Sequence, residues 1–136
     1  TKKKSYSVNF KQLIMSLTNF EEITIDITDE EKNILIPLLI KGFESRTKDN
    51  PIKACNVVQG MNDALEKKDI KIKFTDVRMR KCVNYIRSNA MIPLIATHHG
   101  YYVTTDKKEI QAQTESLLQR AQSIINSAKG LQKFLV

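Results

Sequence analysis

The sequence predicts a mainly α-helical fold with a small antiparallel β-sheet and a long C-terminal helix. Three patterns support this fold class: apolar residues recur at helical spacing in several segments, a stretch around Gly100 alternates like a β-hairpin, and residues 106–136 carry a seven-residue apolar repeat. The chain has 136 residues, 41% of them hydrophobic, which suits one core with an appended element. We expect an arm and short helix over 1–22, a domain over 23–105 and a terminal helix over 106–136.

Two elements are predicted at the start of the chain. Residues 8–18 have the pattern of a short amphipathic helix behind a lysine-rich arm, with these apolar residues at helical spacing: Phe10, Leu13, Ile14 and Leu17. Isoleucine then alternates with polar residues at Ile23, Ile25 and Ile27, which predicts a short, half-buried strand.

The first helix of the domain is predicted from a capping box. Thr28 and Glu31 have the spacing at which each side chain accepts a backbone N–H of the other residue, so we expect a helix from about residue 29 to about Ser45. Pro37 removes one backbone hydrogen bond and should bend this helix. Its apolar stripe consists of Ile34, Leu35, Leu38, Leu39 and Phe43.

A second helix is predicted to start at Asn50 and Pro51, a capping side chain followed by proline at the first helical position. Its buried stripe would be Cys55, Val58, Met61 or Asn62, and Leu65. Two cysteines without close spacing do not indicate a disulfide framework, so we interpret Cys55 and Cys82 as buried free thiols. A metal site is not expected either, because His98 and His99 are adjacent and would point to opposite faces of an extended chain.

A third, basic helix is predicted over 75–88, with Thr75 as its cap and Asp76 in its first turn. Its core stripe is Met79, Cys82, Val83 and Ile86, and the opposite face carries Val77, Arg78, Arg80, Lys81 and Asn84. Residues 70–90 hold six Lys and Arg against one acid in a chain of net charge +7, which is typical of a surface that binds a polyanion. The alternative is a basic face that contacts water alone.

A β-hairpin is predicted after the basic helix. Residues 93–97 and 101–105 favour strands that turn near Gly100, through His98 and His99. Adjacent tyrosines at 101 and 102 suggest stacking on single-stranded bases, but alternation sends one of them into the core, which weakens that interpretation.

The last helix is predicted to be capped by Thr105 and Asp106 and to run from Lys107 to Lys129 or beyond. Its heptad seam consists of Ile110, Thr114, Leu117, Ala121, Ile124, Ala128, Leu131 and Leu135, widened by Leu118 and Ile125. Large and small residues alternate along the seam, so we expect a homodimer in which two helices approach closely. Such a two-fold dimer would prefer an inverted repeat with half-sites about one helical turn apart, or a multiple of it. The alternative is a helix that packs back on its own domain.

Two helices, a basic helix and a hairpin in this order resemble the winged helix-turn-helix DNA-binding family. Residues 74–87 look like a recognition helix, while residues 92–95 and 100–103 look like wing strands. The second half is similar to small winged-helix proteins of phages and mobile elements that carry a long terminal helix. The resemblance implies that Arg78, Arg80, Lys81 and Asn84 meet DNA and that the His98-His99 turn lies near a phosphate or the minor groove. The link before the basic helix departs from the family, because it is longer than the usual 3 to 4 residues.

We therefore expect non-enzymatic binding of double-stranded DNA through the major groove, as a transcriptional regulator or replication accessory protein. The candidate contacts are Thr75, Val77, Arg78, Arg80, Lys81, Asn84, Lys71, Lys73, His98 and His99. Two alternatives are a protein-interaction module that uses residues 107–129 and an RNA-binding protein. The sequence has no glycine-rich phosphate loop, nucleophile motif or metal-ligand cluster, so we expect no enzyme activity, cofactor or metal.

The sequence also predicts a cytoplasmic protein. Its longest apolar run, residues 34–40, is far shorter than the roughly 20 residues of a membrane-spanning helix. The lysine-rich start resembles the first part of a signal peptide, but Asn9, Lys11 and Gln12 interrupt the apolar segment that should follow.

Overall fold

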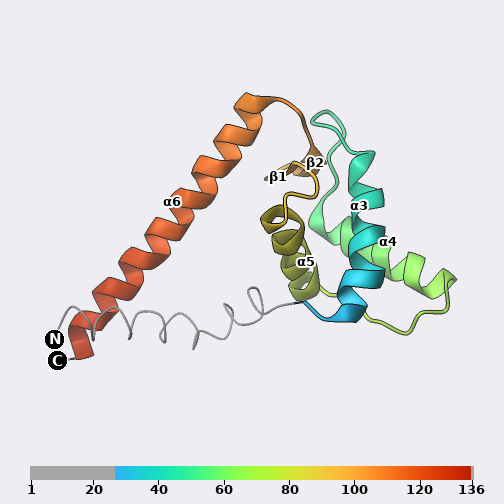
Figure 1. The fold of residues 1–136 in the computed structure, drawn as a ribbon, viewed down its shortest axis with the longest axis horizontal. Coiled ribbons are helices and arrows are strands. Elements are labelled where there is room, and N and C mark those ends of the chain that lie inside the picture. The colour runs from blue at the N-terminus through green and yellow to red at the C-terminus, as the bar shows by residue number, and fades with distance from the viewer. Residues whose placement is uncertain (1–26, 136) are drawn as a thin grey trace.

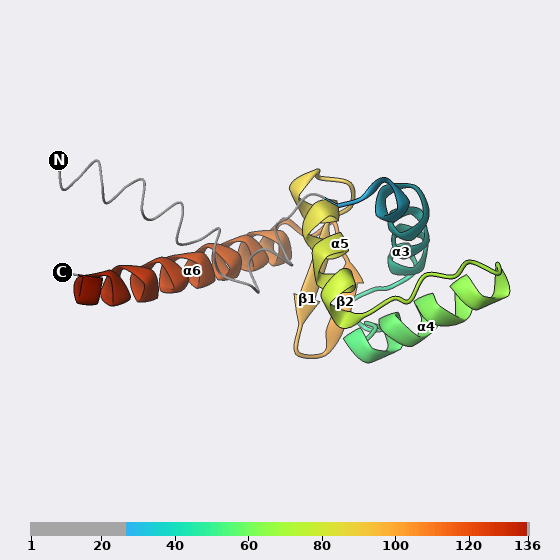
Figure 2. The ribbon, with the colours of Figure 1, turned by 90° about the horizontal axis from the view of Figure 1, so that it is seen from below.

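The computed structural model describes residues 27–135 and confirms a mainly helical fold with a small antiparallel sheet. In chain order the elements are a π-helical turn η1 (Glu31–Leu35), α3 (Ile36–Glu44), α4 (Ala54–Lys67), α5 (Asp76–Ser88), β1 (Leu94–Thr97), β2 (Gly100–Val103), α6 (Lys107–Gln132) and a 3-10 turn η2 (Lys133–Leu135). Figures 1 and 2 show α3, α4, α5 and the hairpin gathered in one body, from which α6 projects. The predicted helix over 8–18 and residues 23–26 of the predicted strand lie outside the described residues. Ile27 is buried but belongs to no strand.

The predicted capping box is confirmed at the start of the first helix. The Thr28 hydroxyl accepts the backbone N–H of Glu31 at 3.1 Å, and the Glu31 carboxylate accepts the N–H of Thr28 at 3.0 Å. The helix ends at Glu44, as predicted. Its first turns are widened, since the Ile36 N–H bonds to the carbonyl five residues back. This widening directly precedes Pro37, which has no N–H, and is the form that the predicted distortion takes.

The predicted helix start at Asn50 and Pro51 is wrong. The chain there is extended, and Ile52 and Tyr101 each donate a backbone N–H to the other's carbonyl, at 2.9 and 2.8 Å. Helix α4 begins at Ala54 instead. Pairing with β2 satisfies two backbone groups of Ile52 that an early helix would have used locally, so tertiary contact overrides the capping signal.

The later start of α4 changes which face is buried. Val57, Met61 and Leu65 are buried, whereas Cys55 is exposed, so the prediction of a buried Cys55 thiol is wrong. Cys82, in α5, is fully buried as predicted. Burial raises the pKa of the Cys82 thiol to about 12, which leaves it unreactive at neutral pH.

The predicted hairpin is confirmed. β1 and β2 pair antiparallel, with Leu94 opposite Val103 and Thr97 opposite Gly100, so His98 and His99 form a two-residue turn. Because Ile52 bridges to the other side of β2, three chain segments meet in the order Ile52, β2, β1. Gly100 permits this approach: its φ is +130°, and a Cβ built on it would lie 2.5 Å from the carbonyl oxygen of Ile52.

We expect Gly100→Ala to destabilise the protein by roughly 1 to 3 kcal/mol through backbone strain, with the overlap on the Ile52 carbonyl in addition. Urea unfolding followed by circular dichroism measures this loss. Gly60→Ala is the matched control, because a Cβ at this helical glycine meets nothing within 4 Å and should stabilise α4 by about 0.5 to 1 kcal/mol. Equal effects of the two substitutions would contradict the close approach at Gly100.

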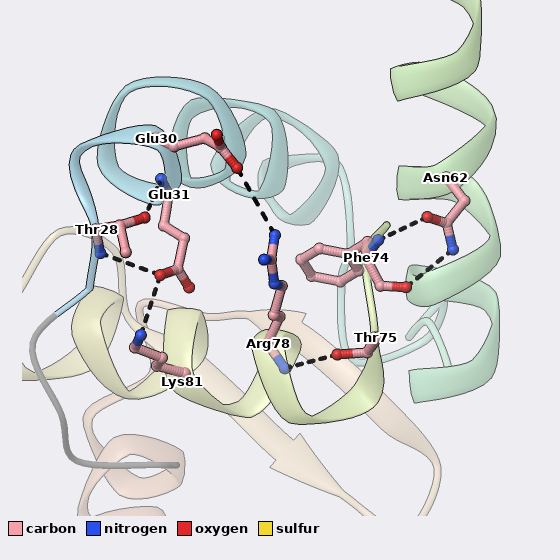
Figure 3. Close-up of polar contacts among 8 residues, drawn as sticks. All are labelled: Thr28, Glu30, Glu31, Asn62, Phe74, Thr75, Arg78 and Lys81. Carbon is pink, nitrogen blue, oxygen red and sulfur yellow. Dashed lines mark hydrogen bonds and ion pairs between the residues drawn. The ribbon is translucent and has the colours of Figure 1, made fainter. Parts of the chain in front are cut away.

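The core of the body is built from α3, α4, α5 and the inner face of the hairpin. It consists of Ile27, Leu35, Ile36, Leu39, Phe43, Val57, Met61, Leu65, Phe74, Met79, Cys82, Val83, Ile86 and Leu94. The link between α4 and α5 is held on this core by Asn62, whose side-chain amide exchanges two hydrogen bonds with the backbone of Phe74, at 2.8 and 3.0 Å (Figure 3). The long link is therefore anchored directly before α5.

The first turns of α6 pack on the outer face of the hairpin. Asp106 caps the helix, as predicted, by accepting the N–H of Lys108 at 2.9 Å. Gln113 accepts the N–H of Ala96, on the outer edge of β1, at 2.6 Å, and Glu109 accepts the hydroxyl of Tyr102 at 2.9 Å. These contacts orient the long helix away from α3 and α4.

Candidate nucleic-acid interface

Helix α5, the predicted recognition helix, has the predicted bounds and core stripe. The hydroxyl of Thr75 accepts the N–H of Arg78 at 3.2 Å, so Thr75 caps the helix and is half-buried. All four residues of the predicted stripe are buried: Met79, Cys82, Val83 and Ile86. The opposite face is therefore directed outward, and Val77, Arg80 and Asn84 are exposed on it.

Lys81 does not belong to this exposed face, and its assignment as a solvent-facing donor is wrong. Its ammonium group lies 3.0 Å from the Glu31 carboxylate, and the two side chains are only 14% and 4% exposed (Figure 3). Burial raises the pKa of Glu31, but hydrogen bonds from Thr28 and Lys81 outweigh burial and hold it below its ordinary value. The pair thus joins the start of the first helix to the middle of α5.

Arg78 is also directed toward the first helix. Its guanidinium lies 3.9 Å from the Glu30 carboxylate, and the Arg78 side chain is 41% exposed. Figure 3 shows Arg78 and Lys81 both reaching from α5 to the acidic turn that contains Glu30 and Glu31. This acidic turn partly neutralises one side of the basic helix.

Two arginines of α5 take different roles. Arg80 pairs with Asp76 on its own helix at 2.8 Å, and both side chains are more than half exposed, so a phosphate can replace this carboxylate at little cost. Arg87 instead turns inward, where it donates to the carbonyl of Leu94 at 3.1 Å and to Gln113 at 3.4 Å. Arg87 therefore holds the edge of β1 and α6 together.

The other predicted contacts lie on two separate parts of the surface. Lys71 and Lys73 are exposed on the link that precedes α5, while His98 and His99 are exposed at the hairpin turn. The two histidine rings contact each other, with centroids 3.8 Å apart and ring planes tilted by 43°.

Sequence reasoning missed Lys53. It is exposed at the N-cap of α4, and it lines a hollow of about 390 Å³ together with His98 and Thr97 from the hairpin turn. No side chain caps α4, so a lysine and the positive end of a helix dipole meet the hairpin turn at this hollow. The start of α4 at Ala54 would have pointed to Lys53. The sequence alone does not predict this start, because it depends on the bridge between Ile52 and β2.

The predicted seam of α6 is mostly exposed in the single chain. Leu117, Ile124 and Leu131 are 36%, 59% and 67% exposed, and Ala128 is buried. The remaining seam residues are half-buried at Ile110 and exposed at Thr114, Ala121 and Leu135. The alternative, in which this helix packs back on its own domain, therefore does not hold for most of the seam.

No matching family model, curated protein or solved structure was found for this chain. Within residues 27–135, no three His, Cys, Asp or Glu side chains gather in a way that could hold a metal ion. None of the helices in that range is long and apolar enough to span a membrane.

Proposed function

We propose that this protein binds double-stranded DNA without catalysing a reaction, and that the outer face of α5 enters the major groove. The observation that carries the proposal is the orientation of α5: its apolar stripe is buried, and Val77, Arg80 and Asn84 lie together on the exposed side. An α-helix fits the major groove, where arginine can bind guanine and asparagine can bind adenine through two hydrogen bonds each.

The order of the elements supports the same function. Two helices, the basic helix and a hairpin follow one another, and the bridge of Ile52 to β2 adds a third segment to the sheet between the first two helices. This is the arrangement that a winged helix-turn-helix domain uses to place a recognition helix beside a wing. On this model the His98-His99 turn and Lys53 contact the phosphate backbone next to the groove.

The proposal differs in one respect from the contacts that the sequence suggested. The carboxylates of Glu30 and Glu31 already engage Arg78 and Lys81, so these two cations contribute less to phosphate binding. Base readout therefore rests on Arg80 and Asn84, with Lys71 and Lys73 as further phosphate contacts.

We expect the double substitution Arg80→Gln with Asn84→Ala to weaken binding to a pool of random duplex DNA. Loss of a base or phosphate contact of this type costs about 1 to 3 kcal/mol, and each lost phosphate contact lowers the log–log salt slope by about 0.9. Fluorescence anisotropy at 50 and 200 mM salt measures both quantities.

Lys129→Gln is the matched control, because it removes one positive charge from the last turns of α6, away from the proposed interface. It should leave affinity nearly unchanged. Equal losses in both variants would mean that binding follows net charge alone, and unchanged affinity in the double variant would remove α5 from the interface. Stronger binding to an RNA duplex of the same length would favour the RNA alternative.

A further inference from the structure

The exposed apolar face of α6 needs an occupant. Six large apolar side chains of α6 and η2 are between 36% and 85% exposed: Leu117, Leu118, Ile124, Leu131, Phe134 and Leu135. Together they offer an area of the same order as the roughly 800 Å² that each partner contributes to a standard protein interface. Monomeric proteins rarely expose a continuous apolar patch of this size.

The base of this face opens into a groove rather than a closed core. α6 contributes Ile110, Gln113, Thr114 and Leu117 to one wall. The other wall is lined by Arg87 of α5, by Ala90, Ile92 and Pro93 of the following link, and by Leu94 of β1. The groove encloses about 380 Å³ and its walls are mainly apolar. Its shape and lining suit the apolar end of another helix.

We propose that a second copy of this chain fills the groove, through an antiparallel α6 pair in which the C-terminal turn of each chain lies on the body of the other. The seam itself is self-complementary in this direction. Its large residues are Ile110, Leu117, Ile124 and Leu131, and its small residues are Thr114, Ala121 and Ala128. An antiparallel pair centred between Ala121 and Ile124 places one large residue opposite one small residue in each of its inner layers.

In this register Thr114 lies opposite the partner's Leu131, and Leu117 lies opposite the partner's Ala128. Ala128 is 9% exposed in the single chain, so it must be uncovered when the pair forms. Ile110, at the base of the groove, meets the partner's Leu135. The partner's Phe134, which is 85% exposed in the single chain, reaches Gln113 and enters the groove. The most exposed large apolar side chains of residues 27–135 therefore fill this groove.

The residues that flank the seam distinguish the two directions. In an antiparallel pair Leu118 lies beside the partner's Ile125, and Arg120 lies beside the partner's Ser127. In a parallel pair Arg120 would lie beside the partner's Ile125, and Leu118 beside the partner's Gln113, so a polar group would meet an apolar one at both places. Matching of apolar with apolar groups thus favours the antiparallel pair.

This arrangement sets the distance between the two bodies. α6 has 26 residues and is about 39 Å long, so an antiparallel pair holds the two bodies at opposite ends of a rod of that length. The dimer does not depend on DNA binding, since its contacts are made by α6 and by the groove behind α5.

Disulfide cross-linking of the full chain tests the direction. In a Cys55→Ser background, which removes the exposed thiol and leaves the buried Cys82, we would prepare Thr114→Cys and Leu131→Cys as separate proteins, one with a size tag. After mixing, oxidation should yield the mixed 114–131 dimer as the main product, with little 114–114 or 131–131 dimer. Gln119→Cys mixed with Asn126→Cys is the matched control on the outer side of α6 and should give little product.

Sedimentation equilibrium of the unsubstituted full chain at micromolar concentration should give twice the mass of the chain. Phe134→Ser with Leu135→Ser should shift it toward the single-chain mass, while circular dichroism verifies that the variant is folded. Predominant 114–114 cross-links would establish a parallel pair and overturn the proposal. A full-length protein of single-chain mass would overturn it as well, and would mean that a different occupant covers α6.

Discussion

Replacing Lys81 with methionine should lower the free energy of unfolding by roughly 3 to 5 kcal/mol, since it leaves the Glu31 carboxylate buried without its cation. Methionine retains most of the apolar stem, so the loss reports mainly the missing charge. Urea unfolding at pH 7 measures the effect. Lys68→Met, which removes an exposed lysine, is the matched control and should change stability by less than about 0.5 kcal/mol.

The double variant Lys81→Met with Glu31→Gln should recover much of this loss, because no charge then stays buried. A double variant as unstable as the single one would show that packing, and not charge, causes the effect. The ion pair also predicts a pH dependence. Because the pKa of Glu31 is lower in the folded protein than in the unfolded chain, its contribution is present above the unfolded value of about 4.3. That contribution is lost as the pH falls through the folded pKa, and it should be missing in the double variant.

Replacing Ile95 with aspartate should destabilise the protein by a similar amount, roughly 3 to 5 kcal/mol, because the new carboxylate would be buried without a partner. Ile95 is 5% exposed, and it lies with Tyr102 on the hairpin face that α6 covers rather than in the core of the body. Glu109 lies on the same hollow, so the introduced charge also meets a charge of the same sign.

Ile95→Asn is the matched control for this experiment, since it removes the same packing and adds no charge. It should lose less stability than Ile95→Asp, and the difference measures the buried charge. We expect Ile95→Asp to separate the first turns of α6 from the hairpin, which protection of the α6 amides from hydrogen exchange would detect. Unchanged stability would mean that α6 leaves this face of the hairpin in solution.

The sequence by itself determined the elements whose signals are local. The capping box of Thr28 and Glu31, the cap of α5 at Thr75 and the hairpin turn at His98 and His99 are all present where predicted. Each depends on hydrogen bonds between residues at most a few positions apart, or on a periodicity within one segment. The buried stripe of α5 follows for the same reason, because a helix of known phase fixes which residues share a face.

The tertiary structure decided everything that depends on contacts between distant segments. The polar face of its own helix predicts that Lys81 meets solvent, but Glu31, fifty positions earlier, binds it. Ile52 and Tyr101 are also far apart in the sequence, and their pairing places the start of α4 at Ala54, which leaves Cys55 exposed and brings Lys53 to the hairpin turn. A pattern within one segment specifies which atoms need a partner, and only the folded chain specifies which partner each one finds.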